Sequence, residues 1–120
     1  MSIVTEKDTI TQTVLDYYEG WFDGDVFRIG RALHPDLVKR CPGEDEAARL
    51  GITTKERMLE LTARGKGKAD APDRRIDIQI EDVYGDIASV TTSTEPYHEY
   101  IHLVRTRDGW KIANVLWQPT

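Results

Sequence analysis

The sequence has little sulfur and no long apolar segment. Cys41 is the only cysteine among 120 residues, so no disulfide can form within the chain, which suits a reducing compartment such as the cytoplasm. No stretch approaches the roughly 20 apolar residues that a membrane-spanning helix requires. The first six residues lack a basic start and an apolar core, so we expect no secretory leader. These absences predict a cytoplasmic protein that does not enter a membrane.

Basic residues are also scarce. Sixteen Lys and Arg stand against twenty-one Asp and Glu, which gives a formal net charge of −5. Nucleic acids and anionic membrane surfaces are bound by clustered positive charge, so we expect neither as a partner. The sequence contains neither the Gly-x-Gly-x-x-Gly dinucleotide turn nor the Gly-x-Ser-x-Gly elbow of hydrolases. We therefore expect no dinucleotide or other cofactor and no hydrolase triad.

The first half of the sequence has the pattern of helices. Apolar side chains recur there every three or four residues, which is typical of a helix with one buried face. Either Thr5 or Thr9 can cap the first helix, and Gly24 ends it. The predicted helices cover residues 10–23, 25–33 and 53–61. We expect loops at residues 44–46 and 65–75, and the second of these loops is either mobile or a lid over a site.

The second half has the pattern of strands. Ile76, Ile78 and Ile80 alternate with polar residues, and Asp108-Gly109 is a strong signal for a hairpin turn. The predicted strands are a short one at residues 37–41 and four long antiparallel ones at residues 76–81, 87–94, 97–105 and 110–117. Helices followed by strands indicate an α+β protein rather than alternating βαβ units.

The spacing of the histidines does not predict a metal site. His98 and His102 are four residues apart on a predicted strand, which separates them by roughly 13 Å. They cannot share one ion, so we expect no metal. His34 has two open interpretations: an acid–base pair with Asp36, or a cap on the second helix, where a positive charge suits the helix dipole.

Several segments together resemble a known family. Lys39-Arg40 belongs to this set, and the other segments are Tyr-Glu-Gly-Trp-Phe-Asp-Gly-Asp at 18–25, Ala-Leu-His-Pro-Asp-Leu at 32–37, Glu-Tyr-Ile-His-Leu at 99–103, Gly-Trp-Lys-Ile at 109–112 and Asn-Val-Leu-Trp at 114–117. With the order of elements, they resemble the nuclear transport factor 2-like superfamily, and within it the branch called "putative lumazine-binding". One departure is Glu99, where that branch usually has aspartate.

The resemblance implies a single domain over residues 1–120. Its fold would be a cone-shaped, curved antiparallel sheet wrapped around about three N-terminal helices, a cystatin-like roll. It also implies a small-molecule ligand in the cone, such as a flat heterocycle of the lumazine type. Compared with ketosteroid isomerase, a relative by fold, Tyr17 stands at the position of a functional tyrosine, but Cys41 replaces the carboxylate base. The isomerase mechanism is therefore not supported.

Alternation along the third long strand divides its side chains between the two faces of the sheet. Ile101 and Leu103 have the character of core residues, which carries Tyr97 and Glu99 toward the cavity. The expected ligand-binding residues are Tyr17, Trp21, His34, Lys39, Met58, Tyr97, Glu99 and Asn114. We expect no catalytic residue to be assignable from the sequence.

The opposite face of that strand is unusually aromatic for a surface in water. Tyr100 and His102 lie on it, and we expect Trp117 to join them. Exposed aromatic residues with few lysines are typical of interfaces, so the sequence predicts a homodimer through this face. Two other functions stay open: a cofactor-free dehydratase, isomerase or cyclase that uses His34, Asp36 or Glu99, and a dimerisation scaffold without a ligand.

Overall fold

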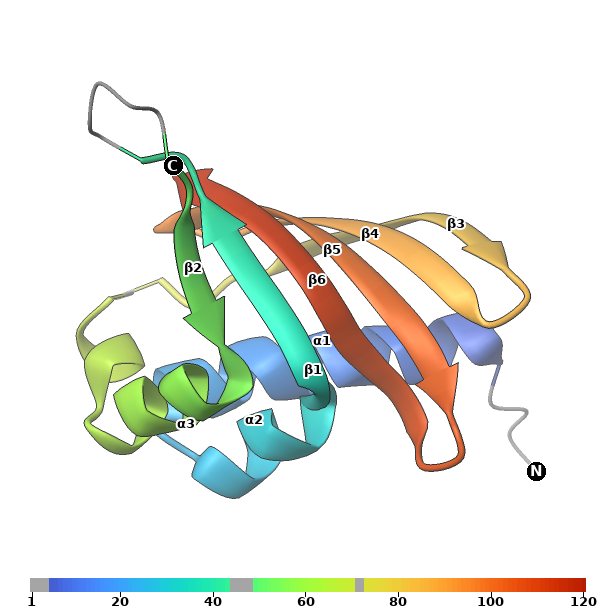
Figure 1. Cartoon of the computed structure of the whole chain (residues 1–120), viewed down its shortest axis with the longest axis horizontal. Helices are drawn as coiled ribbons and strands as arrows, with labels where there is room; N and C mark the ends of the chain where they lie inside the picture. The colour runs from blue at the N-terminus through green and yellow to red at the C-terminus, as the bar shows by residue number, and fades with distance from the viewer. Residues whose placement is uncertain (1–4, 44–48, 71–72) are drawn as a thin grey trace.

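The computed structural model describes residues 5–43, 49–70 and 73–120. Three helices come first, and most of the sheet follows them (Figure 1). The elements in chain order are α1 (Glu6–Asp23), α2 (Val26–Ala32), β1 (Leu33–Cys41), β2 (Gly51–Thr54), α3 (Lys55–Ala63), the 3₁₀ turn η1 (Lys66–Ala69), β3 (Asp77–Tyr84), β4 (Ile87–Ser93), β5 (Tyr97–Thr106) and β6 (Gly109–Pro119).

The helix boundaries follow local capping chemistry. Thr5 caps α1 through a reciprocal pair of hydrogen bonds with Asp8, which decides between the two candidate caps. Gly24 ends the helix with a φ of 68°, a left-handed conformation that glycine adopts without strain. Asp25 caps α2 as expected. The cap of α3 is Thr54, one residue later than the 53–61 prediction implied, and its hydroxyl accepts the backbone N–H of Arg57.

The strands form one open sheet in the order β2-β1-β6-β5-β4-β3. The four long strands, β3 to β6, pair antiparallel with one another, as the sequence predicted. The short strand β1 differs, because it runs parallel to β6 and the sheet is therefore mixed. The strand β2, which pairs antiparallel with β1, was not predicted. It is only four residues long and largely exposed, so it lacks an alternating pattern of burial.

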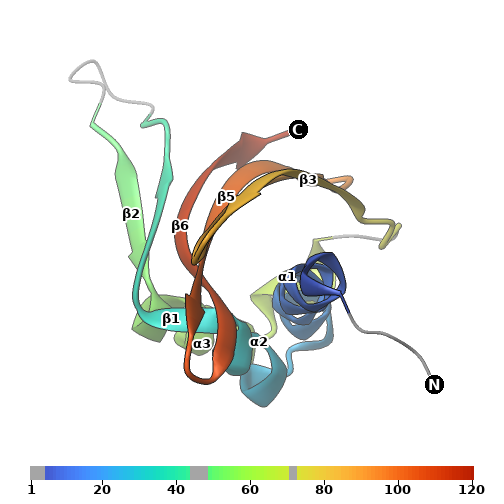
Figure 2. The same cartoon turned by 90° about the vertical axis from the view of Figure 1, so that its right-hand side faces the viewer.

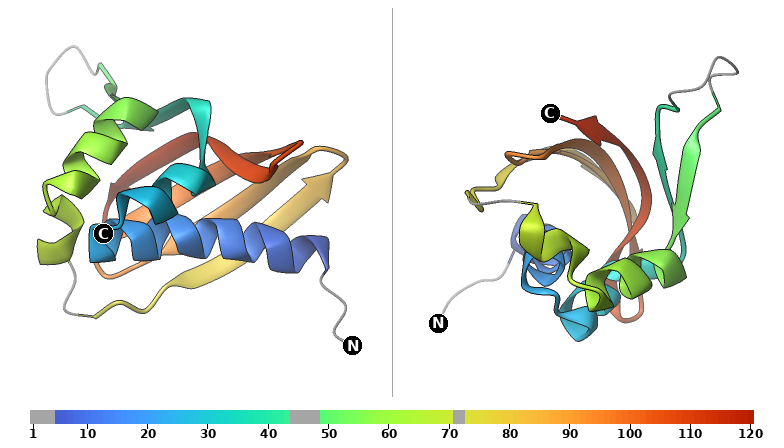
Figure 3. Two further views of the ribbon diagram at one scale, coloured as in Figure 1. Left: turned by 90° about the horizontal axis from the view of Figure 1, so that it is seen from below. Right: turned by 90° about the vertical axis from the view of Figure 1, so that its left-hand side faces the viewer.

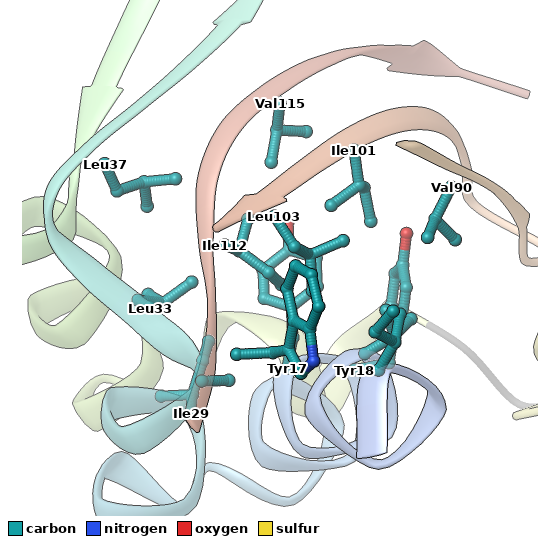
Figure 4. Packing of buried hydrophobic residues seen from close by; sticks show 14 of the residues in the cluster. Tyr17, Tyr18, Ile29, Leu33, Leu37, Val90, Ile101, Leu103, Ile112 and Val115 are labelled. Carbon is teal, nitrogen blue, oxygen red and sulfur yellow. The ribbon is translucent and has the colours of Figure 1, made fainter. Parts of the chain in front are cut away.

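The sheet curves around α1, which lies in its concave face (Figures 1 and 2). The helices α2 and α3 gather at one end of α1, on the side that faces β1 (Figure 3). Side chains from the sheet point toward α1, among them Ile101 and Val115, while Tyr17 and Tyr18 extend from α1 toward the sheet (Figure 4). The interior of this cone is therefore shared by an apolar core and two phenols.

The segment that follows α3 packs on α1. Gly67 in η1 is buried, and a Cβ at this position would collide with the backbone of Trp21. The part of the predicted 65–75 loop that precedes residue 71 is therefore an ordered turn. The predicted acidic loop at residues 44–46 lies outside the described residues. Within the described ranges, no helix has both the length and the apolar character needed to cross a membrane.

Candidate functional site

The register of three neighbouring strands brings together the polar residues of the cone. Thr92 on β4 lies opposite Glu99 on β5, and Glu99 lies opposite Trp117 on β6. Residues directly opposite each other in an antiparallel pair point to the same face, so all three point into the cone. Glu99 is only 1% exposed. A carboxylate in such a position is costly unless its oxygens receive hydrogen bonds.

Two consecutive tyrosines on α1 supply those hydrogen bonds. The hydroxyl of Tyr17 donates to Oε2 of Glu99 at 3.0 Å, and the hydroxyl of Tyr18 donates to Oε1 at 2.8 Å. The proton of Tyr18 is committed to Glu99, so the short hydrogen bond between Tyr18 and Thr92 is donated by the Thr92 hydroxyl. Both carboxylate oxygens are thus held from the helix side.

The charge of Glu99 is balanced from β1. The Nζ atom of Lys39 lies 3.4 Å from Oε2 of Glu99, and it also donates a hydrogen bond to the hydroxyl of Tyr17. Lys39 reaches the interior because it pairs in register with Val115 on β6, a core residue. Its side chain is 9% exposed, so the ion pair is almost fully withdrawn from water. Few buried ion pairs stabilise a fold more than apolar packing would.

Aromatic rings surround the ammonium group of Lys39. Its Nζ atom lies 5.2 Å from the ring centre of Tyr17, 5.8 Å from that of Tyr97 and 4.9 Å from that of Trp117. All three distances are within the range of cation–π attraction. Tyr97 and Trp117 also contact each other edge to face, with centres 5.5 Å apart. The result is a cage of three rings and one carboxylate around a single positive charge.

The environment of the tyrosines keeps them protonated. Burial, and next the negative charge of Glu99, raise the pKa of Tyr17 well above its usual value. The same two causes raise the pKa of Tyr18. Both hydroxyls therefore serve as hydrogen-bond donors to the carboxylate at neutral pH. The arrangement can hold a charged or hydrogen-bonding group in an otherwise apolar interior.

A second polar cluster lies beside the cage. Asp70, the residue after η1, accepts hydrogen bonds from the hydroxyl of Tyr97 and, at 3.2 Å, from Nε1 of Trp21. Burial, and next the hydrogen bond to Asp70, raise the pKa of Tyr97. Tyr97 thus links the cage around Lys39 to the turn that packs against α1.

The structure brings some of the expected ligand residues together and separates others. Tyr17, Lys39, Tyr97 and Glu99 form the cluster around the carboxylate, and Trp21 joins it through Tyr97. Three expected members have other surroundings. His34 lies at the start of β1, Met58 lies on the buried face of α3, and Asn114 lies on the exposed surface of β6.

His34 makes a local contact instead of joining the cluster. Its Nδ1 accepts the backbone N–H of Asp36 at 3.0 Å, and the carboxylate of Asp36 lies 3.9 Å from the same atom. The carboxylate is 92% exposed, so this pair lies at the surface. An acid–base role for the pair would take place outside the cone.

A β-bulge in β6 corrects the predicted faces of Asn114 and Trp117. Ile112 lies opposite Leu103, but Asn114 lies opposite His102, which leaves Ala113 as an extra residue. The bulge reverses the alternation beyond it. Asn114 therefore points outward with His102, and Trp117 points inward with Glu99. The prediction that Trp117 shares the outer face with Tyr100 and His102 is wrong.

Sequence reasoning missed Tyr18, Thr92 and Asp70 as members of the polar clusters. Tyr18 also fits the apolar stripe of the first helix, and its ring does pack against Phe22. A signal existed, because two adjacent buried tyrosines on a helix need acceptors for two hydroxyls. Thr92 and Asp70 carried no comparable signal, since their contacts depend on strand register and on the packing of η1.

The match to a protein family covers nearly the whole chain, from residue 5 to residue 118, and its description is "Putative lumazine-binding". The chain belongs to this family. No curated protein matches the sequence. In this member of the "Putative lumazine-binding" family, Tyr17, Tyr18 and Lys39 hold the buried Glu99.

Solved structures agree with this assignment at the level of the fold. An NTF2-like protein of unknown function from Silicibacter pomeroyi has a TM-score of 0.74 at 14% identity, with 100% of both chains covered. A ketosteroid isomerase-like protein from Erwinia carotovora atroseptica has a TM-score of 0.64 at 16% identity, with 98% of both chains covered. Nostoc punctiforme has a domain of unknown function with a cystatin-like fold, at a TM-score of 0.65 and 10% identity, with 99% of this chain and 80% of that one covered. The nuclear transport factor 2-like cone predicted from the sequence is confirmed.

Proposed function

We propose that this protein is a cytoplasmic small-molecule binding domain whose ligand, a flat heterocycle of the lumazine type, enters the cone beside Glu99. One observation carries the proposal: the Lys39–Glu99 ion pair lies within aromatic walls in the interior of the fold. Replacing a buried ion pair by apolar side chains of similar volume is often neutral or stabilising, so a binding role accounts for these charges better than stability does.

The chemistry of the walls suits a flat ring. Tyr97 and Trp117 offer ring surfaces against which a heterocycle can stack. A carboxylate has about four acceptor positions, and the hydroxyls of Tyr17 and Tyr18 occupy two of those on Glu99, while the ammonium of Lys39 lies 3.4 Å from Oε2. A further position can accept a ring N–H. The family description supports the same class of ligand.

A titration with lumazine tests this proposal. We expect the wild-type chain to bind lumazine, followed through the fluorescence of the ligand, and Glu99→Gln to weaken binding by about tenfold or more, because the amide loses the charged acceptor. Glu81→Gln is the matched control, since Glu81 is exposed on β3. Equal affinity in wild type and Glu99→Gln would contradict the assignment of Glu99, and no binding to wild type would contradict the choice of ligand.

The convergence of Tyr17, Lys39 and Glu99 favours one alternative, acid–base catalysis in the same place. A cofactor-free isomerase, dehydratase or cyclase would use Glu99 as its base. Deuterium exchange into a small enolisable ketone such as cyclohexanone, measured by NMR, would detect this activity. Exchange that Glu99→Gln abolishes and Glu81→Gln preserves would support it, and exchange at the uncatalysed rate would exclude it for this class of ketone.

Apolar exposure on the outer face of the sheet supports a homodimer. Tyr84, Ile87, Tyr100 and Leu116 are all about half or more exposed there, and a hollow of about 370 Å³ adjoins Tyr84 and Ile87. Covering such a surface with a second copy removes it from water. We expect light scattering after size exclusion to give a dimer, and Tyr100→Asp to give a monomer.

Phe27→Asp is the control for the dimer, because Phe27 is 90% exposed on α2, away from the sheet face. It should leave the oligomeric state unchanged. A wild-type chain that remains monomeric at high micromolar concentration would rule out the dimer.

A further inference from the structure

The cage around Lys39 has the composition of a site that recognises cations. The faces of Tyr17, Tyr97 and Trp117 lie 4.9–5.8 Å from its Nζ atom, and Glu99 provides the counter-charge. Aromatic ring faces carry negative potential, and such cages bind ammonium groups in ligands. Here the ammonium group that fills the cage belongs to the protein itself.

The two members of the ion pair differ in how firmly they are held. Glu99 is 1% exposed, receives hydrogen bonds from two tyrosines of α1 and is paired on both sides within the sheet. Lys39 reaches the cage through a flexible four-carbon side chain. The ring walls formed by Tyr97 and Trp117 are only partly buried, so the cage lies close to the surface. Lys39 is therefore the member that a ligand can replace.

The charge of the cage limits what can replace Lys39. An anionic group in this position would face three negative ring faces and the carboxylate of Glu99. A neutral group would leave Glu99 buried without its counter-charge, which is strongly unfavourable. An ammonium group restores every interaction that Lys39 makes. The cage thus selects a cation.

We propose that the ligand of the cone carries an alkylammonium group in addition to the flat ring that lumazine represents, and that this group takes the place of the Lys39 ammonium between Glu99 and the three rings. The inference rests on the proposed binding function and specifies the class of ligand. Lys39 then acts as a competitor built into the chain, because the cage accepts a ligand only in the fraction of molecules whose lysine has moved out. The apparent dissociation constant rises as that fraction falls.

Truncation of Lys39 removes the competitor and gives a test. Lys39→Ala lacks three methylene groups and the ammonium, and n-propylammonium supplies these atoms. The probes are n-propylammonium, the neutral n-propanol and the anionic propionate, each titrated by NMR at constant ionic strength. We expect n-propylammonium to bind the wild-type chain more tightly than the other two, and Lys39→Ala to bind it about tenfold more tightly than wild type.

Two further variants define the site. Lys39→Ala combined with Glu99→Gln should lose the gain in affinity, because the carboxylate that attracts the cation is gone. Lys55→Ala is the matched control, since Lys55 is another partly buried lysine, whose ammonium donates to the backbone oxygen of Leu33 at 3.0 Å. It should bind the probe as wild type does. If Lys39→Ala does not fold, the relative affinities of the three probes for the wild-type chain test the proposal on their own.

The outcomes separate this inference from the proposed function. Equal binding of n-propylammonium and n-propanol, tighter binding of propionate, or no gain in a folded Lys39→Ala variant would overturn the ammonium assignment. Glu99-dependent binding of lumazine would leave the binding function standing in each of those cases. If neither lumazine nor any of the three probes binds, both proposals fail together.

Discussion

The Nζ atom of Lys39 lies 3.4 Å from Oε2 of Glu99, and the two charges are almost completely shielded from water. They come from strands at different parts of the sheet, β1 and β5, which the intervening β6 separates. The ion pair therefore depends on the tertiary fold, and its energetics can be measured by removing each member in turn.

The first prediction concerns the coupling of this pair. Lys39→Met leaves Glu99 buried without a counter-charge, and we expect a loss of about 3–5 kcal/mol in the free energy of unfolding. Lys39→Met combined with Glu99→Gln should be more stable than Lys39→Met alone, because the uncompensated charge is gone. Urea unfolding of the two single variants, the double variant and wild type gives the coupling energy.

Arg64→Met is the control for this cycle. Arg64, which follows α3, pairs with Glu60 at 2.7 Å, but both side chains are about half exposed, so its removal should change stability little. Losses from Lys39→Met and Glu99→Gln that simply add would show that the two groups do not interact in the folded protein.

The second prediction concerns alkaline pH. The pKa values of Tyr17 and Tyr18 are raised above 10.0 by burial and by the charge of Glu99. Above about pH 10 the unfolded chain releases these protons while the folded chain retains them, so stability falls as the pH rises. Each tyrosine contributes about 1.4 kcal/mol per pH unit to this slope.

Tyr17→Phe or Tyr18→Phe should therefore reduce the slope between pH 10 and pH 12 by about 1.4 kcal/mol per unit. Urea midpoints measured across this range provide the slope. Tyr84→Phe is the control, because that side chain is 78% exposed and should leave the slope as it is in wild type. An unchanged slope in both Tyr17→Phe and Tyr18→Phe would contradict the hydrogen bonding described for Glu99.

The third prediction concerns Asp16, which joins α1 to α2. Its carboxylate accepts hydrogen bonds from Arg28 at 3.0 Å and from Arg31 at 3.1 Å. Burial raises the pKa of Asp16, but the hydrogen bonds from Arg31 and Arg28 outweigh it and hold that pKa below 3.8. A lowered pKa means that the carboxylate stabilises the fold above pH 3.8 and loses this contribution as the pH falls through the folded value.

We expect Asp16→Asn to cost about 1–2 kcal/mol at pH 7, and the gap to wild type to close as the pH falls below about 4. Thermal unfolding between pH 7 and pH 3 measures both effects. Asp36→Asn is the control, because the Asp36 carboxylate is 92% exposed, and its stability should equal that of wild type at every pH in this range. A gap for Asp16→Asn that stays constant down to pH 3 would contradict the charged hydrogen bonds.

Much of the fold could be predicted because its signals are local. The spacing of apolar residues in α1, the glycine that ends it and the alternation of Ile76, Ile78 and Ile80 depend only on neighbours in the sequence. Glu99 could be placed inside for the same reason, since Ile101 and Leu103 follow it on the same face of β5.

The errors arose where distant residues decide the outcome. The bulge at Ala113 has no glycine or proline to mark it, yet it reverses the faces of Asn114 and Trp117. The pairing of β6 with β5 and its pairing with β1 both shift in register near Ala113. The presence of Lys39 beside Glu99 likewise depends on the parallel pairing of β1 with β6, which nothing in the sequence of residues 37–41 indicates.

The last prediction compares two glycines in helices. A Cβ on Gly20 in α1 would lie 2.7 Å from the backbone nitrogen of Ile29, so α1 and α2 would have to separate. A Cβ on Gly30 in α2 would meet only the Cδ2 of Leu59, at an ordinary 3.5 Å. Gly20→Ala should therefore cost about 1–3 kcal/mol through overpacking. Gly30→Ala should gain about 0.5–1 kcal/mol, because alanine favours the helix more than glycine does.

Urea unfolding of both variants checks this contrast. Gly20→Ala should also loosen the hydrogen bonds between Asp16 and the two arginines of α2, since these cross the same helix contact. Asp16→Asn should then cost less in the Gly20→Ala background than in wild type, while its cost in the Gly30→Ala background should be unchanged. Equal stabilities for Gly20→Ala and Gly30→Ala would mean that the close contact between α1 and α2 is absent in solution.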